Sequence, residues 1–202
     1  MGYPSSDSRT IAKLQPYSNV VPINFVLKPA SEAEIRNVAL EPLKDCDAIW
    51  LLDGDEFYTE RQIEKVMEFV EFSRKTAWFS LNFKNYVFDG TQWIDGFCPP
   101  RIFRKHFQGV HLKDFYWDND IRYVNEIGLT DYKSLPHIEI PRSAAHVQHM
   151  TWLHTTGKKK WEYQMKHFGH CSYKWNNHIG KLEFDLDFHT KHGLPLPVLN
   201  SD

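Results

Sequence analysis

Cysteine is scarce in this sequence, and the three that occur are widely spaced. They are Cys46, Cys98 and Cys171 in a chain of 202 residues. An odd number at such spacing provides neither a disulfide framework nor a paired-cysteine metal knuckle. We therefore expect a protein of a reducing compartment, and the cytoplasm is the simplest such setting.

Long apolar runs and an excess of charge of one sign are also missing. No run approaches the roughly 20 apolar residues that span a bilayer, and no signal-peptide pattern opens the chain, so we expect a soluble protein without a transmembrane segment. Lys and Arg number 24 against 26 Asp and Glu, for a formal net charge of -2. This balance excludes the global basic field that draws proteins to nucleic acid or anionic membranes. Neither a glycine-rich phosphate loop nor a nucleophile elbow is found.

Aromatic residues, in contrast, are abundant. Trp, Tyr and Phe make up 15% of the chain, and 42% of it is hydrophobic. A chain of this size and composition can bury the core of one ordinary domain. Flat rings suit stacking on sugars or bases, although packing in the core explains most single rings.

The strongest motif is the stretch 49–57, Ile-Trp-Leu-Leu-Asp-Gly-Asp-Glu-Phe. A short apolar run that ends in a turn predicts a buried strand, and its carboxyl end is where open α/β sheets bind ligands. Asp53, Asp55 and Glu56 would repel one another there unless they share a cation or a proton. Mg²⁺ or Mn²⁺, which prefer oxygen ligands, explains the cluster. The alternative is a helix N-terminus decorated with acids that favour the helix dipole.

Strands and helices are predicted to alternate in the first half of the chain. Strands are expected at 19–27 and 48–52. Helices are expected at 31–43, with Ser31 as the cap, and from Thr59 onward. This alternation predicts an α/β fold with a mainly parallel sheet. Further along the chain we expect one or two strands at 77–88, strands at 101–105, 137–140 and 145–152, a helix at 158–174, and a long loop region at 106–135.

Five segments, in order along the chain, carry a family resemblance. Trp-Leu-Leu-Asp-Gly-Asp-Glu-Phe resembles the DxD segment of family 2-type glycosyltransferases with the GT-A fold. Further segments similar to motifs of that family are Ser5–Thr10, Glu34–Leu40, Pro100–Arg104 and Val147–Trp152. Each segment is common by itself, and their order and spacing carry the resemblance. Since the similarity starts at the turn after the family's second strand, we expect a short member that lacks the first strand.

The resemblance implies the fold and the reaction. The expected fold is a single GT-A-like (Rossmann-like) domain over 1–202, with helices on both faces of a mainly parallel central sheet. Residues 1–105 would form the nucleotide- and metal-binding half, 106–180 the acceptor-side half and 181–202 an irregular tail. The expected reaction is metal-dependent, inverting transfer of a sugar from a nucleoside-diphosphate sugar to an acceptor. That acceptor could be a glycan, a protein or a modified nucleic acid.

The resemblance also assigns roles near the donor. Asp55 would bind Mn²⁺ or Mg²⁺ directly, Asp53 would face the ribose or reach the metal through water, and His149 would be the third partner of the metal or the diphosphate. Glu56 could orient these ligands. The nucleotide side would include Arg36, Arg104 and Asp7, although Arg36 could equally be a surface cation and Asp7 could close a local turn.

An inverting transfer also needs a base for the acceptor hydroxyl. Val124-Asn125-Glu126 is similar to a Val-His-Glu segment of the family, which makes Glu126 the first candidate. Asp118 and Asp120 are the alternatives. Two other function classes stay open: a metal-dependent phosphoesterase or nucleotidyltransferase, and a non-catalytic GT-A-like module that binds sugars or a partner.

Overall fold

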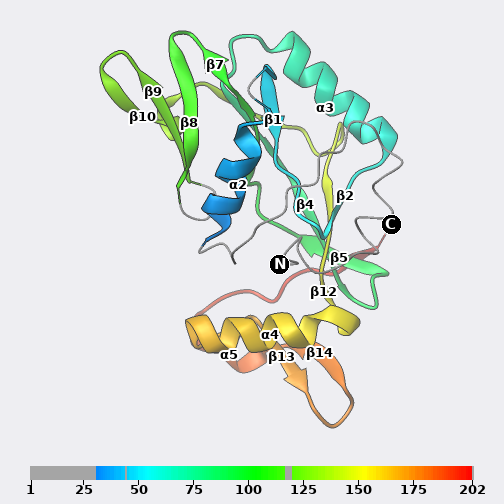
Figure 1. Cartoon of the computed structure of the whole chain (residues 1–202). Coiled ribbons are helices and arrows are strands. Elements are labelled where there is room, and N and C mark those ends of the chain that lie inside the picture. The colour runs from blue at the N-terminus through cyan, green and yellow to red at the C-terminus, as the bar shows by residue number, and fades with distance from the viewer. Residues whose placement is uncertain (1–30, 44, 117–119, 202) are drawn as a thin grey trace. The chain divides into compact units, whose positions relative to one another are not determined.

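The computed structural model describes residues 31–43, 45–116 and 120–201, and its elements are shown in Figure 1. The expected strand at 19–27 lies outside these residues. Contacts between Cα atoms divide the chain into two compact units. Among the described residues, the first unit draws on 31–54, 75–78 and 102–137, and the second on 55–74, 79–101 and 138–201.

Four strands form a sheet in the order β1-β6-β3-β11. Their bounds are β1 (Ala48–Trp50), β3 (Trp78–Leu81), β6 (Pro100–Arg104) and β11 (His137–Ile140). The chain passes from one unit to the other within β3, β6 and β11. The strands expected near 48–52, 101–105 and 137–140 are thus confirmed, each to within two residues.

The first unit also holds one helix and an antiparallel sheet. The helix is α2 (Glu32–Leu40), and the Ser31 hydroxyl at its start accepts a hydrogen bond from the Glu34 backbone N–H, as predicted. The sheet has the order β10-β9-β8-β7. Its strands are β7 (His106–Phe107), β8 (Val110–Tyr116), β9 (Asp120–Asn125) and β10 (Gly128–Asp131), followed by the 3-10 turn η1 (Tyr132–Ser134). Aromatic side chains dominate the core of this unit, among them Trp78, Phe103, Phe107, Phe115 and Tyr123.

The second unit is built on a five-stranded sheet of order β15-β5-β4-β12-β2. These strands are β2 (Glu56–Phe57), β4 (Phe83–Phe88), β5 (Gln92–Asp95), β12 (Val147–Leu153) and β15 (Asn200–Ser201). Helix α3 (Glu60–Phe72) begins with a capping box in which Thr59 and Gln62 bond each other's backbone, and it buries Val66 and Val70.

A smaller layer completes the second unit. Helix α4 (His154–Phe168) packs on β12 and on the hairpin of β13 (Tyr173–Asn176) and β14 (Lys181–Phe184) (Figure 1). Gly157 permits this close approach, because a Cβ atom there would lie 2.9 Å from the Leu182 side chain. The segment expected to be an irregular tail contains β14 and the helix α5 (Leu186–Lys191) instead.

The prediction of a GT-A-like (Rossmann-like) domain with a mainly parallel sheet is wrong. β4 and β12 pair in parallel, whereas β1–β6, β2–β12, β4–β5 and the strands of the β7–β10 sheet pair antiparallel. The reason lies in the connections, since parallel neighbours need a crossover of about a dozen residues or more. Between β3 and β10, every described element is a strand, and most are joined by short turns.

The expectation of a long loop region at 106–135 is also wrong. This region contains strands β7 to β10, which are joined by short connections. Its tightest turn joins β7 to β8 through Gln108 and Gly109, whose φ angles are 46° and 82°. Two successive positive φ angles characterise the hairpin turn whose twist matches that of the flanking strands. Polar residues thus fill a solvated sheet face here rather than a loop.

Candidate functional site

The predicted acidic turn leads into β2, which the sheet of the second unit holds against β12. In this antiparallel register Glu56 lies opposite His149, and the Met150 N–H donates to the Asp55 carbonyl oxygen over 2.9 Å. On its other side β12 pairs in parallel with β4, which puts Asn85 opposite His149. The sheet therefore makes neighbours of Asp55, Asn85 and His149, which are far apart in the sequence.

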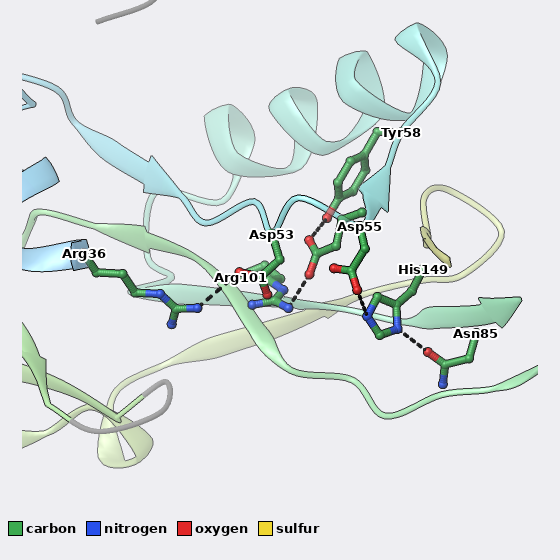
Figure 2. A network of polar contacts seen from close by, with 8 residues as sticks. Arg36, Asp53, Asp55, Tyr58, Asn85, Arg101 and His149 are labelled. Carbon is green, nitrogen blue, oxygen red and sulfur yellow. Dashed lines mark hydrogen bonds and ion pairs between the residues drawn. The ribbon is translucent and has the colours of Figure 1, made fainter. Parts of the chain in front are cut away.

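The imidazole of His149 lies between two oxygen-bearing side chains (Figure 2). Its Nδ1 is 2.6 Å from Oδ1 of Asn85, and its Nε2 is 3.4 Å from Oδ2 of Asp55. An amide oxygen only accepts hydrogen bonds, so Nδ1 must be the protonated nitrogen that donates to it. The His149 side chain is 13% exposed and that of Asp55 42%, so the pair opens to solvent on the Asp55 side.

Glu56 points into the protein instead. Its carboxylate is fully buried and forms an ion pair with the buried guanidinium of Arg101, and the Tyr58 hydroxyl donates to Oε2 at 3.3 Å (Figure 2). Arg101 also lies 5.1 Å from the centre of the Phe83 ring, whose centre is 5.0 Å from that of His149. Glu56 thus fixes the strand next to Asp55, and its carboxylate does not face solvent.

Asp53 and Arg36, both assigned to the nucleotide side, are brought together in the first unit. The Arg36 guanidinium reaches from α2 to Oδ1 of Asp53 over 3.4 Å (Figure 2). The Arg36 side chain is 10% exposed and that of Asp53 41%. Asp53 thus compensates the charge of this largely buried arginine.

Arg104, the other arginine assigned to the nucleotide, makes contacts that support the first unit. Its Nε donates to the Thr76 carbonyl oxygen over 2.9 Å, and its own carbonyl oxygen accepts a hydrogen bond from the Tyr123 hydroxyl at 2.7 Å. These contacts tie β6 to the residues before β3 and to β9. They give Arg104 a structural role beside the one that the resemblance implies.

Of the three candidate bases, the structure describes Glu126 most fully. This residue is exposed in the turn between β9 and β10. The preceding side chain, Asn125, closes the turn by accepting hydrogen bonds from the N–H groups of Ile127 and Gly128 at 2.9 and 3.0 Å. Asp120 begins β9, while Asp118 and Asp7 lie outside the described residues.

No family model, curated protein or solved structure matches this chain. Its chemistry must therefore be inferred from its own side chains. No helix among the described residues is long and apolar enough to cross a membrane.

The Asp55–His149 contact is an ion pair when the ring is protonated, and its geometry would also accommodate a divalent metal ion between the two side chains. Because Nδ1 donates to Asn85, a neutral ring directs the lone pair of Nε2 toward Asp55, and a lone pair and a carboxylate repel unless a proton or a cation lies between them. Metal-ligand distances of about 2.1 Å place adjacent ligands of one ion roughly 3.0–3.4 Å apart, which the observed 3.4 Å matches.

An ion at this position would have Asp55 and His149 as its protein ligands. No group of three His, Cys, Asp or Glu side chains in the described ranges could hold a metal together. This number suits Mg²⁺ or Mn²⁺, because such ions commonly keep waters and substrate phosphates as their other ligands. Asp53, for which the resemblance implied the ribose or a water-mediated contact with the metal, lies 3.4 Å from Arg36.

Two residues of this arrangement were missed by sequence reasoning. Arg101 could have been recognised, because a charge flanked by the buried Ile102 and Phe103 in a strand requires a partner. Asn85 gives no comparable signal, since an exposed or half-buried Asn in a strand is ordinary. Its role follows only from the parallel pairing of β4 with β12.

Proposed function

We propose that this protein is a metal-dependent glycosyltransferase that uses a nucleoside-diphosphate sugar. One observation supports the proposal most directly: Oδ2 of Asp55 lies 3.4 Å from Nε2 of His149, and Asn85 fixes the ring. The sequence resemblance assigned this carboxylate and this histidine to one metal, although 93 residues separate them in the chain (149 minus 55, less one). The fold is not the one that the resemblance implied, so the proposal rests on the residues and not on the architecture.

In this proposal Asp55 and His149 hold Mn²⁺ or Mg²⁺. When bound, the ion supplies Lewis-acid neutralisation of the charge that develops on the leaving diphosphate. Oδ1 of Asn85 accepts a hydrogen bond from the Nδ1–H of His149, which leaves Nε2 as the ligand nitrogen. Glu56, buried against Arg101, holds the strand that carries Asp55.

Arg36 and Asp53 are proposed to serve the nucleotide, with the guanidinium on a phosphate and the carboxylate on the ribose. For the acceptor hydroxyl, Glu126 is the proposed base and Asp118 and Asp120 are the alternatives. Its exposed place in a hairpin turn leaves the Glu126 carboxylate accessible to an acceptor. The three free cysteines fit a reducing compartment, and we propose a cytoplasmic location.

The deciding experiment is donor hydrolysis. The full chain, freed of metal with a chelator, is incubated with a panel of nucleoside-diphosphate sugars with and without added Mn²⁺, and nucleoside diphosphate is quantified. We expect slow, Mn²⁺-dependent release with at least one donor. The Asp55→Asn and His149→Gln variants should lose it by on the order of 100-fold, within the range for loss of one group that stabilises developing charge.

Asp45→Asn is the matched control, because Asp45 is an exposed carboxylate outside the arrangement and its removal should leave the rate unchanged. Turnover that persists in chelator, or in Asp55→Asn, would contradict the proposal. Release of nucleoside monophosphate would indicate a phosphoesterase instead. Donor binding without release in any reaction would indicate a non-catalytic sugar-binding module.

A further inference from the structure

Two histidines on the β7–β8 hairpin face each other, and the proposed function does not use them. His106 on β7 lies directly opposite His111 on β8. The turn between the two strands consists of Gln108 and Gly109, with the positive φ angles of a tight, twist-matched connection. A hairpin closed so tightly holds its first cross-strand positions in a fixed register.

The backbone pattern brings the two side chains still closer. The Leu112 N–H donates to the Lys105 carbonyl oxygen over 2.8 Å. Lys105 and Leu112, the pair next to His106 and His111 along the two strands, are therefore a hydrogen-bonded pair. Narrow and wide pairs alternate along an antiparallel ladder, which makes His106 and His111 a non-hydrogen-bonded pair with Cα atoms about 4.5 Å apart. Side chains at such a pair stand closest to each other.

The side chains converge through the same ring nitrogen. Nδ1 of His106 is 2.6 Å from Nδ1 of His111, the ring centres are 4.8 Å apart, and the ring planes are inclined by 73°. Both residues are exposed. Two nitrogens that point at one spot, open to solvent, need one proton or one cation between them.

We propose that His106 and His111 form a bidentate site for a transition-metal ion, with Cu²⁺ preferred over Ni²⁺ and Zn²⁺. Neutral imidazole nitrogens are ligands for these borderline ions rather than for Mg²⁺ or Ca²⁺, and the stated preference follows the usual order of divalent affinities. In the described part of the chain no third His, Cys, Asp or Glu completes the set, so water supplies the remaining ligands. The rings open by a few tenths of an ångström to admit an ion.

This site is independent of the proposed metal position at Asp55 and His149. His106 and His111 belong to the first unit, whereas Asp55 and His149 belong to the second. The ligand chemistry differs as well, because the hairpin offers two nitrogens and the other pair offers one nitrogen and one oxygen. Either proposal can therefore fail without affecting the other.

The test is calorimetric titration of the full, tag-free chain with Cu²⁺, and with Zn²⁺ in parallel. Asp55→Asn, in which the other proposed metal position is removed, should show one saturable tight site, and wild-type protein should show this site as well. The variants His106→Gln and His111→Gln should each weaken it by on the order of 100-fold or more, because the second ligand of a chelate binds at a high effective concentration. The control is His178→Gln, which removes an exposed histidine that lies in the second unit, and it should bind as wild type.

Circular dichroism verifies that the variants are folded, as expected for substitutions of exposed side chains. A second readout uses Zn²⁺ and the imidazole ¹⁵N resonances, where the Nδ1 signals of both histidines should shift together at one equivalent. An unchanged Cu²⁺ affinity in His106→Gln or His111→Gln overturns the proposal. So does a loss of affinity in His178→Gln as large as in those two variants. So does the absence of saturable binding in the wild type, which would leave the pair as a hydrogen-bonded couple only.

Discussion

Arg101 and Glu56 form an ion pair whose side chains are 4% and 0% exposed. Taking two charges out of water is costly, and each partner depends on the other for compensation. Glu56 is also the residue that follows Asp55 and pairs across the sheet with His149. The buried pair thus connects the stability of the second unit to the geometry of the proposed metal position.

Removing one member of this pair should be strongly destabilising. Arg101→Leu leaves the Glu56 carboxylate buried without its cation, and we expect a loss of about 3–5 kcal/mol in the free energy of unfolding. Urea denaturation followed by circular dichroism measures it. The double variant Arg101→Leu with Glu56→Leu should recover much of the loss, because no uncompensated charge remains.

The control is the exposed pair Lys65–Glu68, whose side chains are 42% and 51% exposed and whose charged atoms are 2.7 Å apart. Lys65→Ala should change the free energy of unfolding by less than about 1 kcal/mol, since water screens such pairs. A double variant of Arg101 and Glu56 as unstable as Arg101→Leu alone would contradict the ion-pair explanation.

The side chain of Asn85 should control metal affinity without affecting the fold. Asn85→Leu removes the acceptor of the His149 Nδ1–H, and the concentration of Mn²⁺ needed for half-maximal donor hydrolysis should rise roughly 10–100-fold. Asn85→Asp keeps an acceptor oxygen and should restore Mn²⁺ activation. Equal Mn²⁺ requirements in the Leu and Asp variants would show that Asn85 does not orient the ligand.

Local features of the fold were predictable, because a few consecutive residues encode them. The Ser31 cap and the helix start at Thr59 are formed as predicted. The direction of the sheets was not predictable, because strand pairing depends on partners distant in the sequence. The parallel neighbours β4 and β12, for example, are joined by a long segment of mostly antiparallel strands.

The same division holds for the candidate site. Asp55 and His149 could be named from motifs, but Asn85 joins them only through the β4–β12 register. Within the Arg36-Asn37 pair, sequence reasoning favoured the charged residue. In the structure Asn37 has a definite contact as well: its Nδ2 donates to the Phe115 carbonyl oxygen at 2.9 Å, and its Oδ1 accepts from the Phe115 N–H at 2.7 Å.

Asn37 should accordingly contribute to the stability of the first unit. Asn37→Asp keeps the acceptor but replaces the amide donor with an oxygen that repels the Phe115 carbonyl, and we expect a loss of about 1–3 kcal/mol in the free energy of unfolding. Chemical denaturation measures it. Val38→Ala, at the next and exposed position of α2, is the control and should stay within about 0.5 kcal/mol of wild type. An Asp variant as stable as wild type would argue that the two hydrogen bonds contribute nothing net.

Tyr123 should make the protein sensitive to alkali. Burial raises the pKa of its phenol well above the ordinary value, and the positive charge of Arg104 offsets this only in part. Below pH 10 the phenol is neutral in both the folded and the unfolded state, so its contribution is fully present. Above pH 10 the unfolded chain loses the proton and the folded one keeps it, so stability should fall by up to about 1.4 kcal/mol per pH unit for this residue.

The variant Tyr123→Phe tests whether ionisation of this phenol lowers the stability at high pH. At pH 7 it should be less stable by about 1 kcal/mol, because the hydrogen bond from the phenol to the Arg104 carbonyl oxygen is lost. Between pH 10 and pH 11.5 its stability should fall less steeply than that of wild type, and the two curves should converge. The stability of Tyr123→Phe should still decrease somewhat with pH in this range, since burial also raises the pKa of Tyr173. Urea denaturation across this pH range measures the free energy of unfolding of each protein. Tyr163→Phe, which replaces a 49% exposed tyrosine, is the control. Curves for wild type and Tyr123→Phe that stay parallel up to pH 11.5 would mean that this phenol ionises as readily in the folded state as in the unfolded one.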